Sequence, residues 1–168
     1  MSDSWQSKFT EKLQARQQSR KELRRDFGAY QEMVVKLFEL IMSKVSGIDT
    51  IQVQRPMPVR TDKFRENITG HIDTIKSMTL RCDGKLVEFV PEGINFDFGK
   101  GRVRILHKSK NLPDYLYLYL VVDPASTAEY PANLTWVIHD RDGELQAASS
   151  PFDEARIEAL IEAAFLSE

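Results

Sequence analysis

The densest group of side chains that could bind a metal or take part in catalysis is the segment 139–144, which reads His-Asp-Arg-Asp-Gly-Glu. Asp140 and Asp142, followed by Gly143, have the residue types with which a calcium-binding loop begins. An EF-hand loop also needs a third oxygen ligand, a glycine at its sixth position and a glutamate at its twelfth, and these are missing. Asp-Gly is a strong two-residue turn sequence, so we interpret the segment as the tip of a hairpin.

Histidine and cysteine offer little further chemistry. His71, His107 and His139 lie far apart in the sequence, and none has a second histidine at the spacing of a metal site. Cys82 is the only cysteine, so the chain can form neither an internal disulfide nor a cysteine-based zinc site. We therefore expect no catalytic residues, no metal site and no cofactor, although residues distant in sequence could still converge.

A glycine-rich segment at 99–102 could be taken for a phosphate-binding loop. It joins two expected strands rather than a strand and a helix, so the glycines are better explained by a hairpin. Lys100, Arg102 and Arg104 could still contribute to an anion-binding edge of the sheet.

Basic side chains recur every four residues along the N-terminal segment, and two more widen the basic surface: Lys8, Lys12, Arg16, Arg20, Arg24, Lys21 and Arg25. Each pair of like charges four residues apart destabilises an isolated helix by roughly 0.2–0.5 kcal/mol. An acidic protein surface or nucleic acid could balance this charge. No aromatic platform is interleaved with the charges, which weakens the interpretation as a surface for single strands. The alternative is a solvated helix whose long side chains lie along a neighbouring element.

The same segment carries an apolar seam with the 4-3 spacing of a heptad repeat, from Phe9 to Ile41. We predict that a docking or self-association surface is formed by Trp5, Phe9, Leu13, Leu23, Phe27 and Tyr30. Arg16 and Arg20 interrupt this seam. Polar groups at such positions select the register or the partner at a cost in stability, so they favour an acidic partner over a simple homodimer.

This seam and the row of basic side chains, which we call the basic stripe, require a long helix. We expect it over residues 4–46, either as one helix or as two in series. Asp3 or Ser4 could cap its start. Gly28 costs about 1 kcal/mol relative to alanine in a helix interior, so a kink or break is expected there.

An antiparallel sheet is expected to follow from Met78 onward, with turns at 83–84, 100–101 and 142–143. The register that keeps apolar residues together sets Leu80 opposite Val87, Phe96 opposite Ile105, and Ile138 opposite Ala147. The apolar run 115–122 reads as a central strand with both faces covered.

A final helix is expected after this sheet, with Ser150 as its cap and Pro151 in its first turn. Its apolar stripe comprises Ile157, Leu160, Ile161, Ala164 and Phe165.

These elements predict an α+β fold with a long N-terminal helix, an antiparallel meander sheet of six or seven strands, and a C-terminal helix packed on the sheet. We expect residues 1–28 to form a protruding basic segment and residues 29–168 a single globular domain. The 168 residues include 42% hydrophobic and 29% charged side chains, which is typical of such a domain.

Charge is distributed unevenly along the chain. Residues 1–112 carry 21 basic and 14 acidic side chains, whereas residues 113–168 carry 2 and 11. The polar N-terminus does not read as a secretory signal, and the longest apolar run, 115–122, is far shorter than the ~20 residues of a membrane helix. We therefore expect a cytoplasmic protein without a membrane partner.

Three hypotheses for function follow. The first, which we favour, is a non-enzymatic interaction or assembly module that binds itself or a larger protein through its N-terminal helix. The second is a nucleic-acid-associated protein that uses the basic stripe. The third is a small enzyme with a pocket between the helices and the sheet, although fold class alone does not imply such a function.

Overall fold

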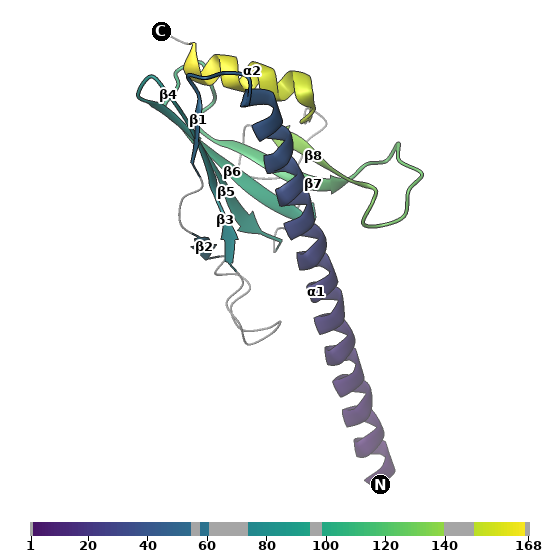
Figure 1. Ribbon diagram of the computed structural model, residues 1–168. Coiled ribbons are helices and arrows are strands. Elements are labelled where there is room, and N and C mark those ends of the chain that lie inside the picture. The colour runs from purple at the N-terminus through teal and green to yellow at the C-terminus, as the bar shows by residue number, and fades with distance from the viewer. Residues whose placement is uncertain (1, 55–57, 61–73, 95–98, 140–149, 167–168) are drawn as a thin grey trace.

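The computed structural model describes residues 2–54, 58–60, 74–94, 99–139 and 150–166 (Figure 1). The chain order of its elements is α1 (Ser2–Val45), β1 (Gln52–Gln54), β2 (Pro58–Arg60), β3 (Thr74–Lys76), β4 (Met78–Cys82), β5 (Lys85–Gly93), β6 (Gly101–His107), β7 (Leu116–Val122), β8 (Leu134–His139), β9 (Ser150–Pro151) and α2 (Glu154–Phe165). None of the helices in the described ranges is long and apolar enough to cross a membrane.

The main sheet has seven strands in the order β1-β4-β5-β6-β7-β8-β9, and every neighbouring pair is antiparallel. Strands β4 to β9 follow one another as a meander, and β1 adds to the outer edge of β4. Strands β2 and β3 form a separate two-stranded sheet. The predicted fold class is confirmed: a long N-terminal helix, an antiparallel sheet and a C-terminal helix in an α+β arrangement.

One face of the main sheet packs against both helices, because apolar and polar residues alternate along its strands. In β6, Val103 and Ile105 are buried while their neighbours Arg102 and Arg104 are partly exposed. The helical side of this core includes Tyr30, Val34, Leu37, Ile41, Ile157 and Leu160. Figure 1 shows the C-terminal half of α1 and the whole of α2 on this side of the sheet.

Helix α1 is a single helix of 44 residues and runs through Gly28 without interruption. The predicted break at Gly28 does not occur, because Phe27, Ala29 and Tyr30 are all buried and hold the helix on the domain at this point. The predicted cap is also wrong, since the helix begins at Ser2 and therefore includes Asp3 and Ser4.

The predicted hairpin at 83–84 is confirmed with its register, in which Leu80 pairs with Val87 and Met78 with Phe89. Asp83 and Gly84 both have positive φ, 49° and 75°, as the tight turns that join paired strands require.

The second predicted register is wrong. Ile105 pairs with Phe89 on β5 and with Leu116 on β7, so no side of Ile105 is left for Phe96. Strand β5 is longer than expected and continues past Pro91 to Gly93 through an irregularity in its pairing with β6. Residues 95–98 lie outside the described part of the chain.

The third predicted register is also wrong, because Ile138 pairs with Ser150 rather than with Ala147. The turn at 142–143 lies outside the described residues. Ser150 and Pro151 belong to β9, so they are not the cap and first turn of the last helix, which begins later than predicted, at Glu154. Asp153 caps α2, and its side chain accepts a hydrogen bond of 3.0 Å from the backbone N–H of Arg156.

Helix α2 turns its predicted apolar stripe toward the core: Ile157, Leu160, Ala164 and Phe165 are buried. On its outer side, Lys44 of α1 forms ion pairs with Glu154 at 2.8 Å and Glu158 at 2.9 Å. These two contacts raise the pKa of Lys44 above its usual value. They tie the end of α1 to the start of α2.

Candidate partner-binding helix

The first part of α1 extends beyond the domain (Figure 1). Every residue from Trp5 to Glu22 is exposed, and burial begins only at Leu23, which is partly covered. At 1.5 Å per residue this exposed stretch is about 27 Å long. Its side chains therefore lie beyond the reach of the sheet that covers the rest of the helix.

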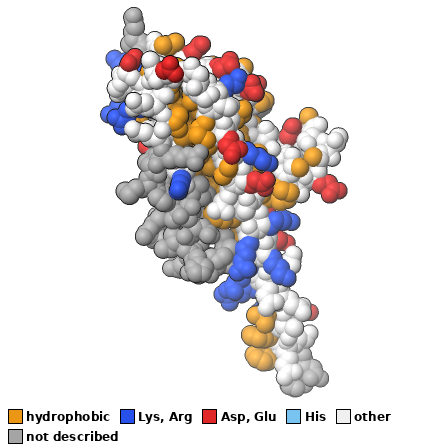
Figure 2. All heavy atoms as spheres, viewed as in Figure 1, with side chains coloured by type: hydrophobic (Ala, Val, Ile, Leu, Met, Phe, Trp, Pro, Cys, Tyr) orange, Lys and Arg blue, Asp and Glu red, His pale blue; other side chains and the backbone are white. Residues whose placement is uncertain are grey.

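The tip of this stretch carries three large apolar side chains at a spacing of four residues. Trp5, Phe9 and Leu13 are 68%, 55% and 45% exposed. The rings of Trp5 and Phe9 stack, with their centroids 5.5 Å apart and their planes 17° from parallel. Figure 2 shows apolar side chains gathered on one side of the helix near its end. Large apolar groups in a continuous exposed row are typical of an interaction site.

Basic side chains follow between this tip and the domain, where Figure 2 shows them as a group. With about 100° of rotation per residue, Arg16 and Arg20 fall on the side of α1 that bears Phe9 and Leu13. This is also the side that is buried farther along, at Val34 and Ile41. The face that packs on the sheet thus continues past the sheet, first as a basic surface and then as an apolar one.

The predicted basic residues do not all belong to this face. Lys8, Lys12, Arg16, Arg20, Lys21, Arg24 and Arg25 are all exposed. Arg25 is used within the molecule: it pairs with Asp26 at 3.4 Å and lies 4.8 Å from the centroid of the Tyr130 ring. Lys21 follows Arg20 directly and so points about 100° away from it around the helix.

Two members of the predicted docking surface lie in the core of the domain instead. Phe27 is 4% exposed and Tyr30 is fully buried. Tyr30 donates a hydrogen bond of 2.7 Å to the carbonyl of Arg102 and accepts one of 3.2 Å from the N–H of Gly93. Burial raises the pKa of Tyr30 well above its usual value. The seam available to a partner is therefore Trp5, Phe9 and Leu13, with Leu23 at its boundary.

A polar contact holds the base of the exposed stretch in place. The hydroxyl of Tyr130, in the loop between β7 and β8, donates a hydrogen bond of 2.6 Å to Asp26. Partial burial, and then this contact with Asp26, raise the pKa of Tyr130 to about 12. The sequence gives no hint of this pair, because 104 residues separate its members. The helix thus leaves the domain from a fixed point.

The other predicted sites have no comparable geometry in the described ranges. Arg102 pairs with Glu92 at 3.0 Å and stacks 4.6 Å from the centroid of the Tyr117 ring, so it serves the sheet rather than an exposed anion-binding edge. Among the residues that the structure describes, no three His, Cys, Asp or Glu side chains lie together as a metal site would require. The segment 140–144 lies outside those residues. Between helices and sheet, fully buried side chains such as Tyr30, Phe89 and Leu118 fill the space.

No family model, no curated protein and no solved structure matches this chain. Its function is therefore inferred from the geometry of α1 and of the domain that holds it.

Proposed function

We propose that this protein is a non-catalytic binding module that presents the exposed part of α1 to a larger protein with an apolar groove rimmed by acidic side chains. One observation carries the proposal. The core-facing side of α1 continues for about 27 Å beyond the domain, and nothing in the described residues covers it from Trp5 to Glu22.

The composition of this stretch supports a partner rather than a free helix. Its basic residues repel one another at intervals of four, which weakens an isolated helix. Trp5, Phe9 and Leu13 leave apolar surface in water. Insertion of one apolar helix face into a groove removes that surface from water, and it is a common mode of recognition between proteins.

Charge favours an acidic partner over a second copy of the chain. In a parallel pair each arginine of the seam would lie beside its own counterpart. In an antiparallel pair centred near residue 18, Arg16 of one copy would lie opposite Arg20 of the other. Like charges placed directly across such a seam are destabilising. An antiparallel pair that overlaps only at the apolar tip avoids this repulsion but leaves the arginines uncovered.

Nucleic acid is the second candidate, because the basic residues alone suit a phosphate backbone. It gives no role to the row formed by Trp5, Phe9 and Leu13. The rings of Trp5 and Phe9 stack on one another at the tip. The basic residues nearer the domain, from Arg16 to Arg25, have no aromatic side chain among them, as a base-stacking surface would require. The two candidates therefore differ in whether the apolar tip contributes to binding.

A binding titration with defined probes separates these possibilities. The probes are a labelled helical peptide of about 28 residues with leucines at its seam and glutamates beside them, the same peptide with lysines in place of the glutamates, and duplex DNA of about 20 base pairs. We expect the acidic peptide to bind in a salt-dependent manner, and the variant with Trp5→Ala and Phe9→Ala to bind it at least about ten-fold more weakly. Tight binding of DNA that is indifferent to these two substitutions would contradict the proposal.

A further inference from the structure

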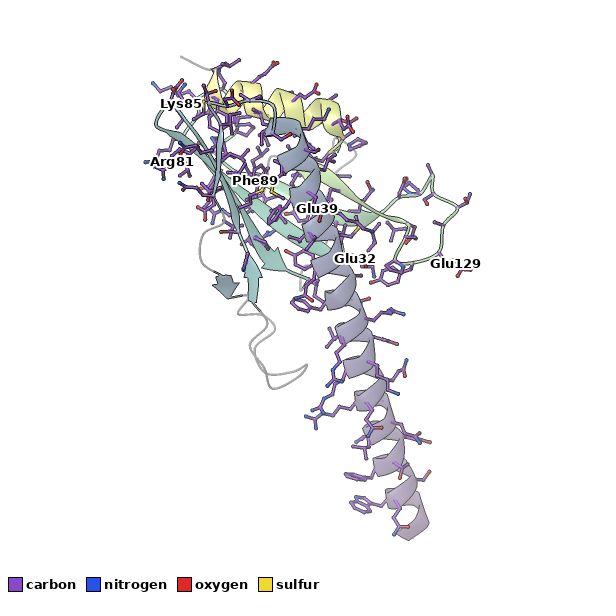
Figure 3. The ribbon with its side chains drawn as sticks, in the orientation of Figure 1. Glu32, Glu39, Arg81, Lys85, Phe89 and Glu129 are labelled. Carbon is purple, nitrogen blue, oxygen red and sulfur yellow. The ribbon has the colours of Figure 1, made fainter. Side chains whose placement is uncertain are left out.

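A cleft of about 640 Å³ opens at the end of the main sheet, where the β4–β5 hairpin meets the loop after β6. Figure 3 shows Arg81 and Lys85 there, at the end of the molecule farthest from the tip of α1. The four Lys and Arg residues among its lining come from these two connections: Arg81, Lys85, Lys108 and Lys110. No aspartate or glutamate is among the described residues that line it.

Apolar side chains also line the cleft, and we call the pair Leu86 and Leu106 its floor. Leu86 and Leu106 come from adjacent strands of the sheet, and Ala164 comes from the last turn of α2. Leu86 remains 37% exposed. The combination of a concave apolar floor with a few charged groups at its border is typical of sites for small ligands, and the volume lies within their usual range.

Hydrogen bonds fix the loop that carries Lys108 and Lys110. Nδ1 of His107 accepts a bond of 3.1 Å from the N–H of Ser109, so Nε2 carries the proton and donates to the carbonyl of Pro113 at 2.7 Å. The hydroxyl of Ser109 donates to the carbonyl of Ala163 in α2 at 2.7 Å and accepts from the N–H of Asn111 at 3.2 Å. The two lysines are therefore carried by a preorganised loop attached to α2.

The β4–β5 hairpin, which lines another part of the cleft, is attached to α2 through Lys85. Its Nζ donates a hydrogen bond of 3.2 Å to the carbonyl of Phe165 at the end of α2. This contact satisfies a terminal helix carbonyl, which explains the presence of one cation. It does not explain why Arg81, Lys108 and Lys110 are gathered at the same cleft, since like charges held close together repel one another.

We propose that this cleft binds a small organic phosphate, with the phosphate between Arg81, Lys108 and Lys110 and its apolar group on Leu86 and Leu106. Three cations suit a dianion better than a single carboxylate, and charge-assisted hydrogen bonds from arginine and lysine are the usual means of holding phosphate. The site is independent of the exposed part of α1, so its failure would leave the proposed partner-binding function untouched.

Titration calorimetry and amide NMR shifts test this site on the full chain, with phenyl phosphate, inorganic phosphate and benzoate as probes. We expect phenyl phosphate to bind at least about ten-fold more tightly than either of the others, because only it engages both the cations and the floor. The amide shifts should be concentrated at Leu86, Ser109 and Lys110.

Two double variants with the same loss of charge provide the comparison. R81Q with K110Q should weaken the binding of phenyl phosphate at least about ten-fold, whereas K12Q with K21Q on α1 should leave it within about two-fold. Substitution L86N, at an exposed position, should reduce the advantage of phenyl phosphate over inorganic phosphate. Equal binding of all three probes, or equal losses in the two double variants, would overturn the proposal.

Discussion

The ring of Tyr30 packs so closely against Gly101 that a β-carbon added at Gly101 would overlap Cδ2 and Cε2 of the ring. This contact joins the middle of α1 to the first residue of β6 and is supported by the two hydrogen bonds of the Tyr30 hydroxyl. It lies within the part of α1 that belongs to the domain, which begins at Leu23. The exposed stretch, from Glu22 back to Trp5, precedes that part.

Substitution of this glycine tests the contact. We expect Gly101→Ala to lower the free energy of unfolding by about 1–3 kcal/mol, because the core must move to accommodate a methyl group. Gly28 is the matched control: it lies in the same helix as Tyr30, and an added β-carbon would meet nothing within 4 Å. Gly28→Ala should raise the free energy of unfolding by up to about 1 kcal/mol, since alanine favours a helix. Urea denaturation of both variants measures these changes, and equal effects would contradict the close packing at Gly101.

The contact between Tyr130 and Asp26 predicts a pH dependence. The pKa of Tyr130 is raised from 10.0 to about 12 in the folded protein, so the neutral phenol is favoured by folding. Its contribution to stability is fully present below about pH 10 and is lost as the pH rises toward 12.

Tyr130→Phe should therefore lower the free energy of unfolding by about 1–2 kcal/mol at neutral pH, because a hydrogen bond to a carboxylate is lost. The difference between this variant and the parent should shrink above about pH 10. Chemical denaturation of both proteins at pH 8 and at about pH 11 measures it. A difference that stays constant with pH would show that the hydroxyl of Tyr130 does not carry the effect.

Two shortened chains test where the helix stops contributing to the domain. A chain that begins at Leu23 should unfold within about 0.5 kcal/mol of the full chain, because Trp5 to Glu22 are exposed throughout. A chain that begins at Ala29 should lose more than about 2 kcal/mol, since it lacks the buried ring of Phe27 and the partner of Tyr130. The boundary after residue 28 stays a prediction from sequence, and equal stability of both shortened chains would support it.

Local signals in the sequence account for the parts of the fold that were predicted. The Asp83-Gly84 turn fixed the pairing of Leu80 with Val87, because a two-residue turn leaves only one register with apolar residues on the same face. The predicted pairing of Phe96 with Ile105 was wrong because the residues around a turn do not show how far the preceding strand extends. Strand β5 continues past Pro91 and pairs along β6, so that the position opposite Ile105 is already taken by Phe89.

The candidate site could be predicted only in part. Leu13 and Phe27 occupy equivalent positions of the heptad repeat, yet one is 45% exposed and the other 4%. Helical periodicity identifies the apolar face of a helix but not the element that covers it. The contact of Asp26 with Tyr130, and the gathering of Arg81 with Lys108, depend on how distant parts of the chain meet.

The most direct test of the proposed function compares two adjacent residues of α1 in the same titration with the acidic peptide. Arg20→Glu and Lys21→Glu cause the same change in net charge, but only Arg20 lies on the side of α1 that bears Phe9 and Leu13. We predict that Arg20→Glu weakens binding at least about ten-fold and that Lys21→Glu changes it less than about three-fold. Equal losses in the two variants would mean that the helix attracts acidic molecules through its overall charge and presents no specific docking face.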